Sequence, residues 1–251
     1  MIKGRIFASW LVVGAVLLAG NASADQPTAR DIIEAAYGAA GGETWRRPQT
    51  LELTGVASFY RDGKADQLTV VDDYHMWRMF PGESADAHAA NGRVRFDAYS
   101  AGKLVFQISY DGRHSYNQHG RIEDDTANAQ WSNSFGFGII RFALDEGFEV
   151  KRLADDTVDG HPCYFVRVSD PAGKHTIFGI DRDAYRIRMV GFETPRGWHH
   201  RIYDQFRWHE NPRFLQPTHV RLYYDGVKTN DILWQTFQVN HSIDPALFTL
   251  D

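Results

Sequence analysis

Residues 163–193 read CYFVRVSDPAGKHTIFGIDRDAYRIRMVGFE: three short segments rich in alternating apolar and polar residues, separated by Pro171-Ala172-Gly173 and Arg182-Asp183. Alternation of this kind matches a strand with one buried face, because successive side chains of a strand point to opposite faces. Short turns between such segments are typical of antiparallel neighbours. The stretch therefore predicts consecutive strands of an antiparallel sheet.

Similar segments fill most of the remaining chain. They are TLELTGVASFY, DQLTVVDDYHMWRMF, VRFDAYS, KLVFQISY, RHSYNQ and FEVKRLA before this stretch, and GWHHRIYDQFRW, THVRLYYDG and DILWQTFQVN after it. We expect about eleven strands in all, and the twist that accumulates over so long a sheet makes it curl or split. We therefore predict a mainly β fold with some α, built on a strongly curved antiparallel sheet that forms an unclosed β-barrel.

Two segments depart from this pattern and predict helices. Residues 27–40 have Thr28 as a candidate helix cap and apolar residues at helical spacing, and Gly41-Gly42 ends the segment. Residues 126–147, TANAQWSNSFGFGIIRFALDEG, have apolar residues three or four apart and predict one helix or two short ones. Helices that interrupt a meander can bury their apolar faces on the concave side of the sheet. We therefore expect the helices there.

The N-terminus has the features of a secretory signal peptide. Lys3 and Arg5 precede an uncharged apolar run, which ends at Ala22-Ser23-Ala24. Asn21 stands where a lipoprotein would have its acylated cysteine. We predict cleavage of residues 1–24 after Ala24 and a soluble periplasmic protein, with residues 25–251 as one half-barrel domain. An uncleaved N-terminal anchor helix is the alternative.

Composition narrows the function classes. The first 24 residues hold two of the 27 Lys and Arg and none of the 32 Asp and Glu, so the remaining 227 residues have a formal net charge of −7. Such an acidic chain is a poor nucleic-acid binder, and we expect a monomer. Cys163 is the single cysteine, which rules out an internal disulfide. Its place in an alternating segment predicts a buried, inert thiol.

No catalytic motif stands out. The sequence lacks a G-x-S-x-G elbow, an H-E-x-x-H pair, a C-x-x-C pair and a G-x-x-x-x-G-K loop. Adjacent strand residues such as His199 and His200 point to opposite faces and do not grip one metal. We therefore expect no cofactor, no metal and no enzymatic activity. An enzyme whose site assembles from distant positions remains a third alternative.

Several segments resemble the periplasmic lipoprotein-carrier superfamily. AAGGETWRRPQTLELTG at 39–55 is similar to the helix, glycine break and Trp that precede its first strand. DGHPCYFVRV, HTIFGID and RIRMVGF resemble its later hairpins, and FQVNHSIDPALF resembles its final strand and ending. The resemblance implies a helix-covered half-barrel that holds lipid, lipoprotein acyl chains or another apolar ligand. The resemblance also allows a membrane-associated donor or acceptor protein as a partner. A periplasmic sensor or regulator of the same fold, binding a protein partner, is the alternative function.

An apolar cavity is the site expected in such a fold. We predict that residues of the glycine-loosened segment form a movable cover and that aromatic strand residues form its floor. The cover would consist of Phe135, Phe137, Ile139, Ile140 and Phe142, and the floor would include Trp77, Phe106, Trp198 and Trp234. The alternative for the cover is a core helix whose glycines, Gly136 and Gly138, allow close packing.

Overall fold

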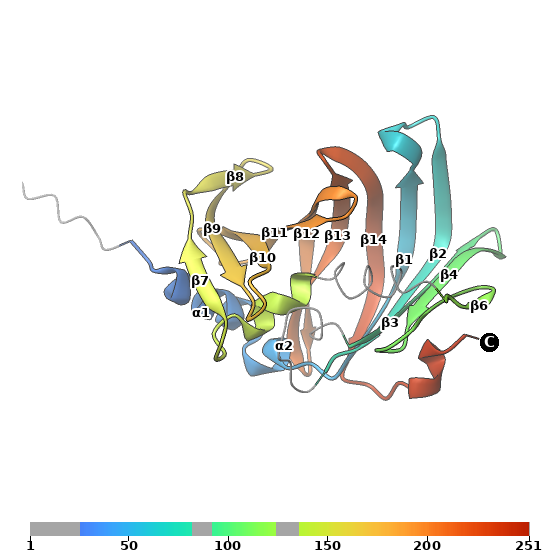
Figure 1. Cartoon of the computed structure of the whole chain (residues 1–251), viewed down its shortest axis with the longest axis horizontal. Helices are drawn as coiled ribbons and strands as arrows, with labels where there is room; N and C mark the ends of the chain where they lie inside the picture. Colours follow the sequence, from blue (N-terminus) through green and yellow to red (C-terminus); the bar gives the residue numbers. More distant parts are fainter. Residues whose placement is uncertain (1–25, 82–91, 124–135, 251) are drawn as a thin grey trace, which may run out of the picture.

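Fourteen strands form one antiparallel sheet in the computed structural model, which describes residues 26–81, 92–123 and 136–250 (Figure 1). The strands are β1 Thr50–Tyr60, β2 Leu68–Met79, β3 Arg93–Ser100, β4 Lys103–Tyr110, β5 Ser115–Asn117, β6 Gly120–Arg121, β7 Glu149–Arg152, β8 Asp156–Val158, β9 His161–Ser169, β10 His175–Asp181, β11 Ile187–Thr194, β12 Gly197–Glu210, β13 Arg213–Tyr224 and β14 Val227–Val239. The helices described are α1 Ala29–Ala40, α2 Glu43–Arg46 and the 3-10 helices η1 Arg61–Gly63, η3 Gly136–Phe142 and η4 Pro245–Phe248.

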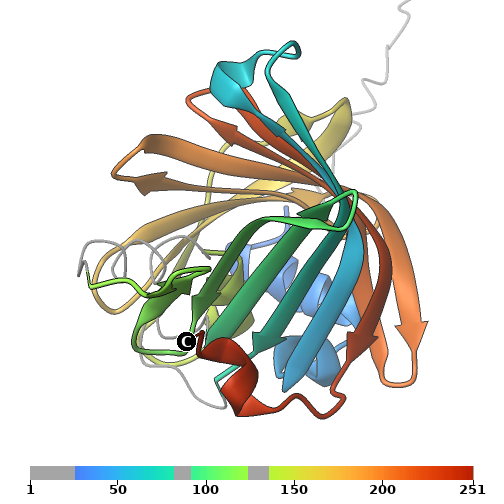
Figure 2. The same cartoon turned by 90° about the vertical axis from the view of Figure 1, so that its right-hand side faces the viewer.

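The sheet is a meander whose first and last long strands meet in its middle. Its order is β6-β5-β4-β3-β2-β1-β14-β13-β12-β11-β10-β9-β7, and β8 pairs with β9. The sheet is strongly curved (Figure 2). Its two edges do not pair, so it forms an open half-barrel and not a closed barrel. The predicted unclosed, strongly curved sheet is confirmed. The structure has more strands than the predicted eleven or so, because β6 and β8 have only two and three residues and are too short to show alternation.

Helix α1 confirms the predicted N-terminal helix. Thr28 and Asp31 form a capping box at its start, and Gly41 ends it with a φ of 130°. Its buried face presents Ile32 and Ile33 to the same apolar core as strand residues such as Phe178. The helix therefore packs on the concave side of the sheet, as predicted (Figure 2).

The predicted 126–147 helix differs from the structure. Residues 126–135 lie outside the described residues, and Gly136–Phe142 forms a 3-10 helix followed by turns instead of an α-helix. Two glycines within seven residues weaken an α-helix, and tertiary packing buries the neighbouring Ile139 and Ile140 completely. These two side chains belong to the core shared with α1 and the sheet, so η3 also lies on the concave side.

The position of η3 follows from the topology. The chain leaves one edge of the sheet at β6 and joins the other edge at β7, and η3 belongs to this connection. The described part of the connection that contains η3 thus lies on the concave side of the half-barrel. Within the described residues, no helix is both long and apolar enough to span a membrane.

Candidate functional site

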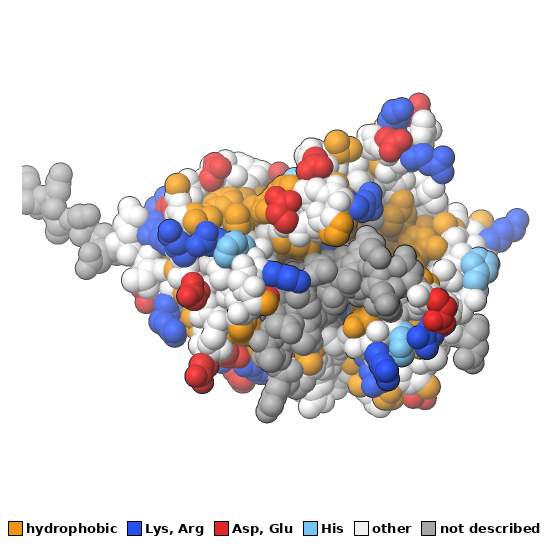
Figure 3. Space-filling model, in the orientation of Figure 1, with side chains coloured by type: hydrophobic (Ala, Val, Ile, Leu, Met, Phe, Trp, Pro, Cys, Tyr) orange, Lys and Arg blue, Asp and Glu red, His pale blue; other side chains and the backbone are white. Residues whose placement is uncertain are grey.

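A pocket opens on the concave face between β2, β14 and η3. The cavity has a volume of about 140 Å³ and is open to solvent at its mouth. In the space-filling view, hydrophobic side chains gather in a hollow over β14, β1 and β2 (Figure 3). Most of the lining is apolar or aromatic: Leu51, Tyr74, Met76, Phe80, Phe96, Tyr203, Pro217, Val220, Leu222, Ile232 and Trp234.

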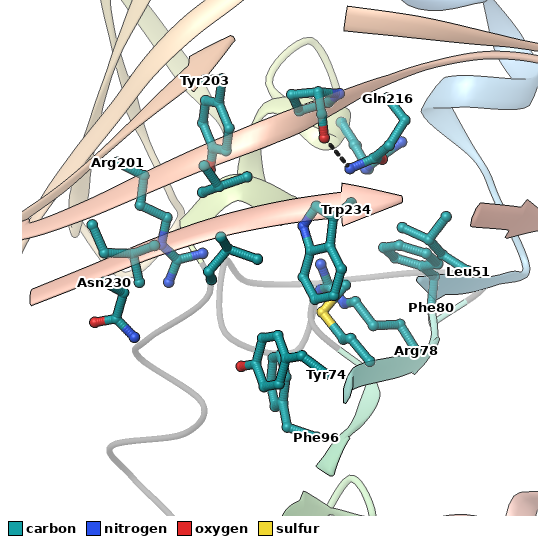
Figure 4. Close-up of a pocket in the computed structure, with 16 residues that line it drawn as sticks. Leu51, Tyr74, Arg78, Phe80, Phe96, Arg201, Tyr203, Gln216, Asn230 and Trp234 are labelled. Atoms are coloured by element: carbon teal, nitrogen blue, oxygen red, sulfur yellow. Dashed lines mark hydrogen bonds between the residues drawn. The ribbon is translucent and has the colours of Figure 1, made fainter. Parts of the chain in front are cut away.

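Three stacked aromatic rings form one wall of the pocket. Trp234 of β14 lies parallel to Tyr74 of β2, with ring centroids 5.3 Å apart and an interplanar angle of 11°. Tyr74 in turn stacks on Phe96 of β3 at 5.9 Å and 16° (Figure 4). Offset aromatic stacking stabilises such an array beyond the area that it buries. The wall is therefore a continuous aromatic surface.

Gly55 lies on the strand between Tyr74 and Trp234. Strand β1 lies between β2 and β14, and Gly55 has both Tyr74 and Trp234 as its cross-strand partners. Both pairings shift register next to Gly55, and a Cβ at this position would collide with the backbone carbonyl of Leu233. The lack of a side chain thus lets the backbone of β14 approach β1 closely beside the two stacked rings. A glycine within an alternating strand is the sequence signal of such a close approach.

Three arginines line the same pocket. They are Arg78 of β2, Arg141 of η3 and Arg201 of β12, and the lining described here includes no Asp or Glu. Figure 4 shows Arg78 and Arg201 extending into the pocket from different strands. The site therefore combines an apolar lining with concentrated positive charge.

Aromatic rings support two of these arginines. The Arg78 side chain is 6% exposed and its guanidinium lies 4.6 Å from the ring centre of Phe80. Burial lowers the pKa of Arg78 to about 10, and the charge of Arg201 contributes to this shift. Arg141 is 2% exposed and lies 4.1 Å over the Trp45 ring. Burial also lowers the pKa of Arg141, and the positive charge of Arg78 acts in the same direction.

A neutral histidine positions the third arginine. Arg201 Nε donates to Nε2 of His199 at 2.9 Å, and Nδ1 of His199 lies 3.1 Å from the carbonyl oxygen of Tyr223. Burial lowers the pKa of His199 to about 2, and the charge of Arg201 lowers it further. His199 therefore stays neutral, with its proton on Nδ1 directed at Tyr223, and accepts the hydrogen bond from Arg201.

Helices α1 and α2 hold η3 against the sheet and so fix Arg141. The Tyr37 hydroxyl donates to the carbonyl oxygen of Ile140 at 2.6 Å, and Arg46 Nε donates to the carbonyl oxygen of Arg141 at 3.2 Å. Arg46 and Arg47 also pair with Asp145, which follows η3. The position of Arg141 thus depends on contacts with residues about a hundred positions earlier in the chain.

The structure divides the predicted floor residues between the two faces of the sheet. Trp234 lines the pocket. Phe106 lies in an adjoining hollow, where its ring centroid is 5.3 Å from that of Phe59. Trp77 lies between Met76 and Arg78 on β2, which both line the pocket, so it faces the convex side. Trp198 covers Gly191 and faces away from the pocket. These two tryptophans differ from the prediction because the alternation of β2 and β12 turns them outward.

The predicted cover residues have different outcomes. η3 contains Ile139, Ile140 and Phe142, whose side chains are buried and do not line the pocket. Arg141 lines the pocket from η3. Phe135 and the side chain of Phe137 lie outside the described residues. None of the three pocket arginines is among the residues predicted from the sequence. The signal for Arg78 is its place on the same strand face as Tyr74, and Arg201 similarly shares a face with Tyr203.

Other candidate centres carry less chemistry. Within residues 26–81, 92–123 and 136–250, no group of three or more His, Cys, Asp or Glu residues is arranged to hold a metal ion. Cys163 is buried, as its alternating segment predicts, and burial raises the pKa of its thiol to about 11. A thiol with this pKa remains protonated at neutral pH.

Comparisons with known proteins place the fold. No protein-family model matches the sequence, and no curated protein matches it. A DUF1329 family protein of Desulfovibrio piger superposes with a TM-score of 0.52 at 13% identity, over 89% of this chain and 98% of that one. A LolA superfamily protein of Nitrosomonas europaea gives the same TM-score, identity and coverage. This chain therefore shares the fold of these two proteins, as its resemblance to the periplasmic lipoprotein carriers predicts.

Proposed function

We propose that this protein is a periplasmic carrier or binding protein for a lipid, an acyl chain or another apolar ligand. The observation that carries the proposal is the pocket on the concave face, with its stacked wall of Trp234, Tyr74 and Phe96. Small-molecule sites are typically concave, mostly apolar and largely preformed. The fold of the LolA superfamily supports this class of function without identifying the ligand.

The energetics of burial favour a chain-like apolar ligand. Each methylene removed from water contributes about 0.8 kcal/mol, so a chain with ten buried methylenes gains about 8 kcal/mol before the costs of association. The arrangement needs no catalytic group. Burial raises the pKa values of Tyr74 and Tyr203, away from neutral pH, which suits a wall that binds rather than one that transfers protons.

The proposed compartment rests on the first 24 residues. Their charged start, apolar run and Ala22-Ser23-Ala24 ending support export and cleavage, although these residues lie outside the described structure. We propose that residues 25–251 act as one untethered domain in the periplasm. Mass spectrometry of the protein from the periplasmic fraction should give a chain that begins at Asp25 without acyl modification. A full-length chain in the membrane fraction would contradict this location.

A titration with the uncharged fluorescent probe N-phenyl-1-naphthylamine tests binding. We expect saturable fluorescence enhancement with the purified protein. Met76→Glu, which places a carboxylate in the apolar lining, should weaken probe binding. Leu233→Glu is the matched control, because Leu233 lies beside Ile232 and Trp234 on β14 but is 41% exposed and absent from the lining. A folded protein that binds no probe, or equal losses in both variants, would overturn the proposal.

A further inference from the structure

We propose that the ligand of this protein has one long alkyl or acyl chain, which extends from the pocket into a second hollow of the concave face. This inference rests on the proposed function, because it assigns the length and shape of the ligand whose apolar part occupies the pocket. The second hollow has a volume of about 700 Å³ and is open to solvent. Its apolar lining includes Phe59, Phe106, Ile108, Tyr224 and Val227.

The pocket and the second hollow follow one another along β14. Asn230 lines both of them, and Figure 4 shows it at one end of the pocket. Ile232 and Trp234 line the pocket on one side of Asn230, and Thr229 and Val227 line the second hollow on the other. The seven positions from Trp234 to Val227 correspond to about 23 Å of strand. A compact apolar molecule fills only part of this length, whereas an extended chain follows it.

Aromatic rings connect the two spaces. The Phe59 ring of the second hollow packs edge-to-face on Tyr74 of the pocket wall, with ring centroids 5.7 Å apart. Phe106 lies 5.3 Å from Phe59 and 6.3 Å from Tyr74, also edge-to-face. Tyr74 in turn stacks on Trp234. Such ring pairs are favourable contacts that hold their members together. The aromatic surface of the pocket therefore continues into the second hollow.

The second hollow also has a polar edge. Arg61 and Asp62 of η1 contribute to its lining, and so does Arg196 in the turn between β11 and β12. All three residues are exposed. Removing a polar group from water without a new partner is costly, so the polar end of a ligand is best placed at such an edge. A chain that begins there and extends inward buries its methylenes in the second hollow and then in the pocket.

The experiment is a series of competitors of increasing chain length against N-phenyl-1-naphthylamine. The competitors are octanoate, decanoate, dodecanoate, tetradecanoate and hexadecanoate, each below its micellar concentration. Each methylene that becomes buried should increase the affinity about fourfold. We expect the increase to continue up to hexadecanoate, because the longer chains gain contacts in the second hollow. An affinity that stops increasing at decanoate would overturn the inference, since the ligand would then be confined to the pocket.

Two variants of β4 assign the effect to the second hollow. Ile108 lines the second hollow but not the pocket, so Ile108→Gln should weaken hexadecanoate about tenfold and leave octanoate nearly unchanged. Leu104→Gln is the matched control, because Leu104 lies on the same strand, is 43% exposed and is absent from both linings. Equal losses of hexadecanoate affinity in the two variants would contradict the assignment. The chain-length series on the unaltered protein remains decisive even where a variant fails to fold.

The outcomes separate this inference from the proposed function. If the probe does not bind at all, the proposed function fails. If the probe binds but the affinity of the competitors does not increase beyond decanoate, the protein binds compact apolar ligands and only the long chain is wrong. If Ile108→Gln weakens octanoate as much as hexadecanoate, the long chain does not depend on the second hollow, which would also overturn the inference.

Discussion

Removal of the Tyr37 hydroxyl should loosen η3 by a predictable amount. In Tyr37→Phe, the Ile140 carbonyl loses the donor at 2.6 Å but keeps its second hydrogen bond, from the Ala143 amide at 3.2 Å. The carbonyl is therefore not orphaned, and the loss should be about 1–1.5 kcal/mol, the net value of one buried hydrogen bond. For a domain of this size, that corresponds to a decrease in melting temperature of roughly 2–6 °C. Burial raises the pKa of Tyr37 to about 12, so its hydroxyl remains a donor over the whole neutral range.

The assay is thermal unfolding by circular dichroism, with urea unfolding as a second measure of stability. Tyr110→Phe is the matched control, since the Tyr110 hydroxyl donates to the Gly112 carbonyl at 3.0 Å in an exposed turn. We expect its melting temperature to change by less than about 1 °C, because exposed groups exchange this bond for water. Equal shifts in the two variants, or no shift in Tyr37→Phe, would refute the argument that this bond fixes η3.

Three further predictions concern single residues. Gly55→Ala should destabilise the protein by about 2 kcal/mol or more in urea unfolding, because its Cβ meets the Leu233 carbonyl and the backbone has to move. Burial lowers the pKa of His199 to about 2 from 6.5, so its contribution to stability is complete above pH 6.5 and decreases as the pH falls. Between pH 6 and pH 4.5, the free energy of unfolding measured in urea should decrease in the unaltered protein by about 1.4 kcal/mol per pH unit more than it does in His199→Gln. Equal decreases in the two proteins would contradict this. Cys163, whose pKa burial raises to about 11, should react with iodoacetamide at pH 8 only after denaturation, and rapid labelling of the native protein would show that it is accessible.

Local patterns were sufficient to predict the sheet and the first helix. Alternation and turn residues indicate β9, β10 and β11, and Thr28 with Gly41-Gly42 marks the ends of α1. The elements that local patterns did not predict have physical reasons as well. β6 and β8 are too short to alternate, and η3 takes its form from tertiary contacts rather than from its own period.

The pocket was harder to predict, because alternation separates two faces of a strand without showing which one is concave. Trp77 and Trp198 were chosen for their aromatic character, yet both lie on the convex side. Arg78 and Arg201 share the pocket face with Tyr74 and Tyr203, but arginines in strands are mostly exposed. Arg141 reaches the pocket through contacts of η3 with α1 and α2, which connect residues about a hundred positions apart.

A crystal structure of the protein with 12-bromododecanoate would test the central claim most directly, because the anomalous signal of bromine locates the end of the acyl chain. We predict a bromine peak in the concave pocket beside the wall of Tyr74, Phe96 and Trp234. The contradicting result is a bromine peak on the convex face, or an empty pocket at a concentration that saturates the protein in solution.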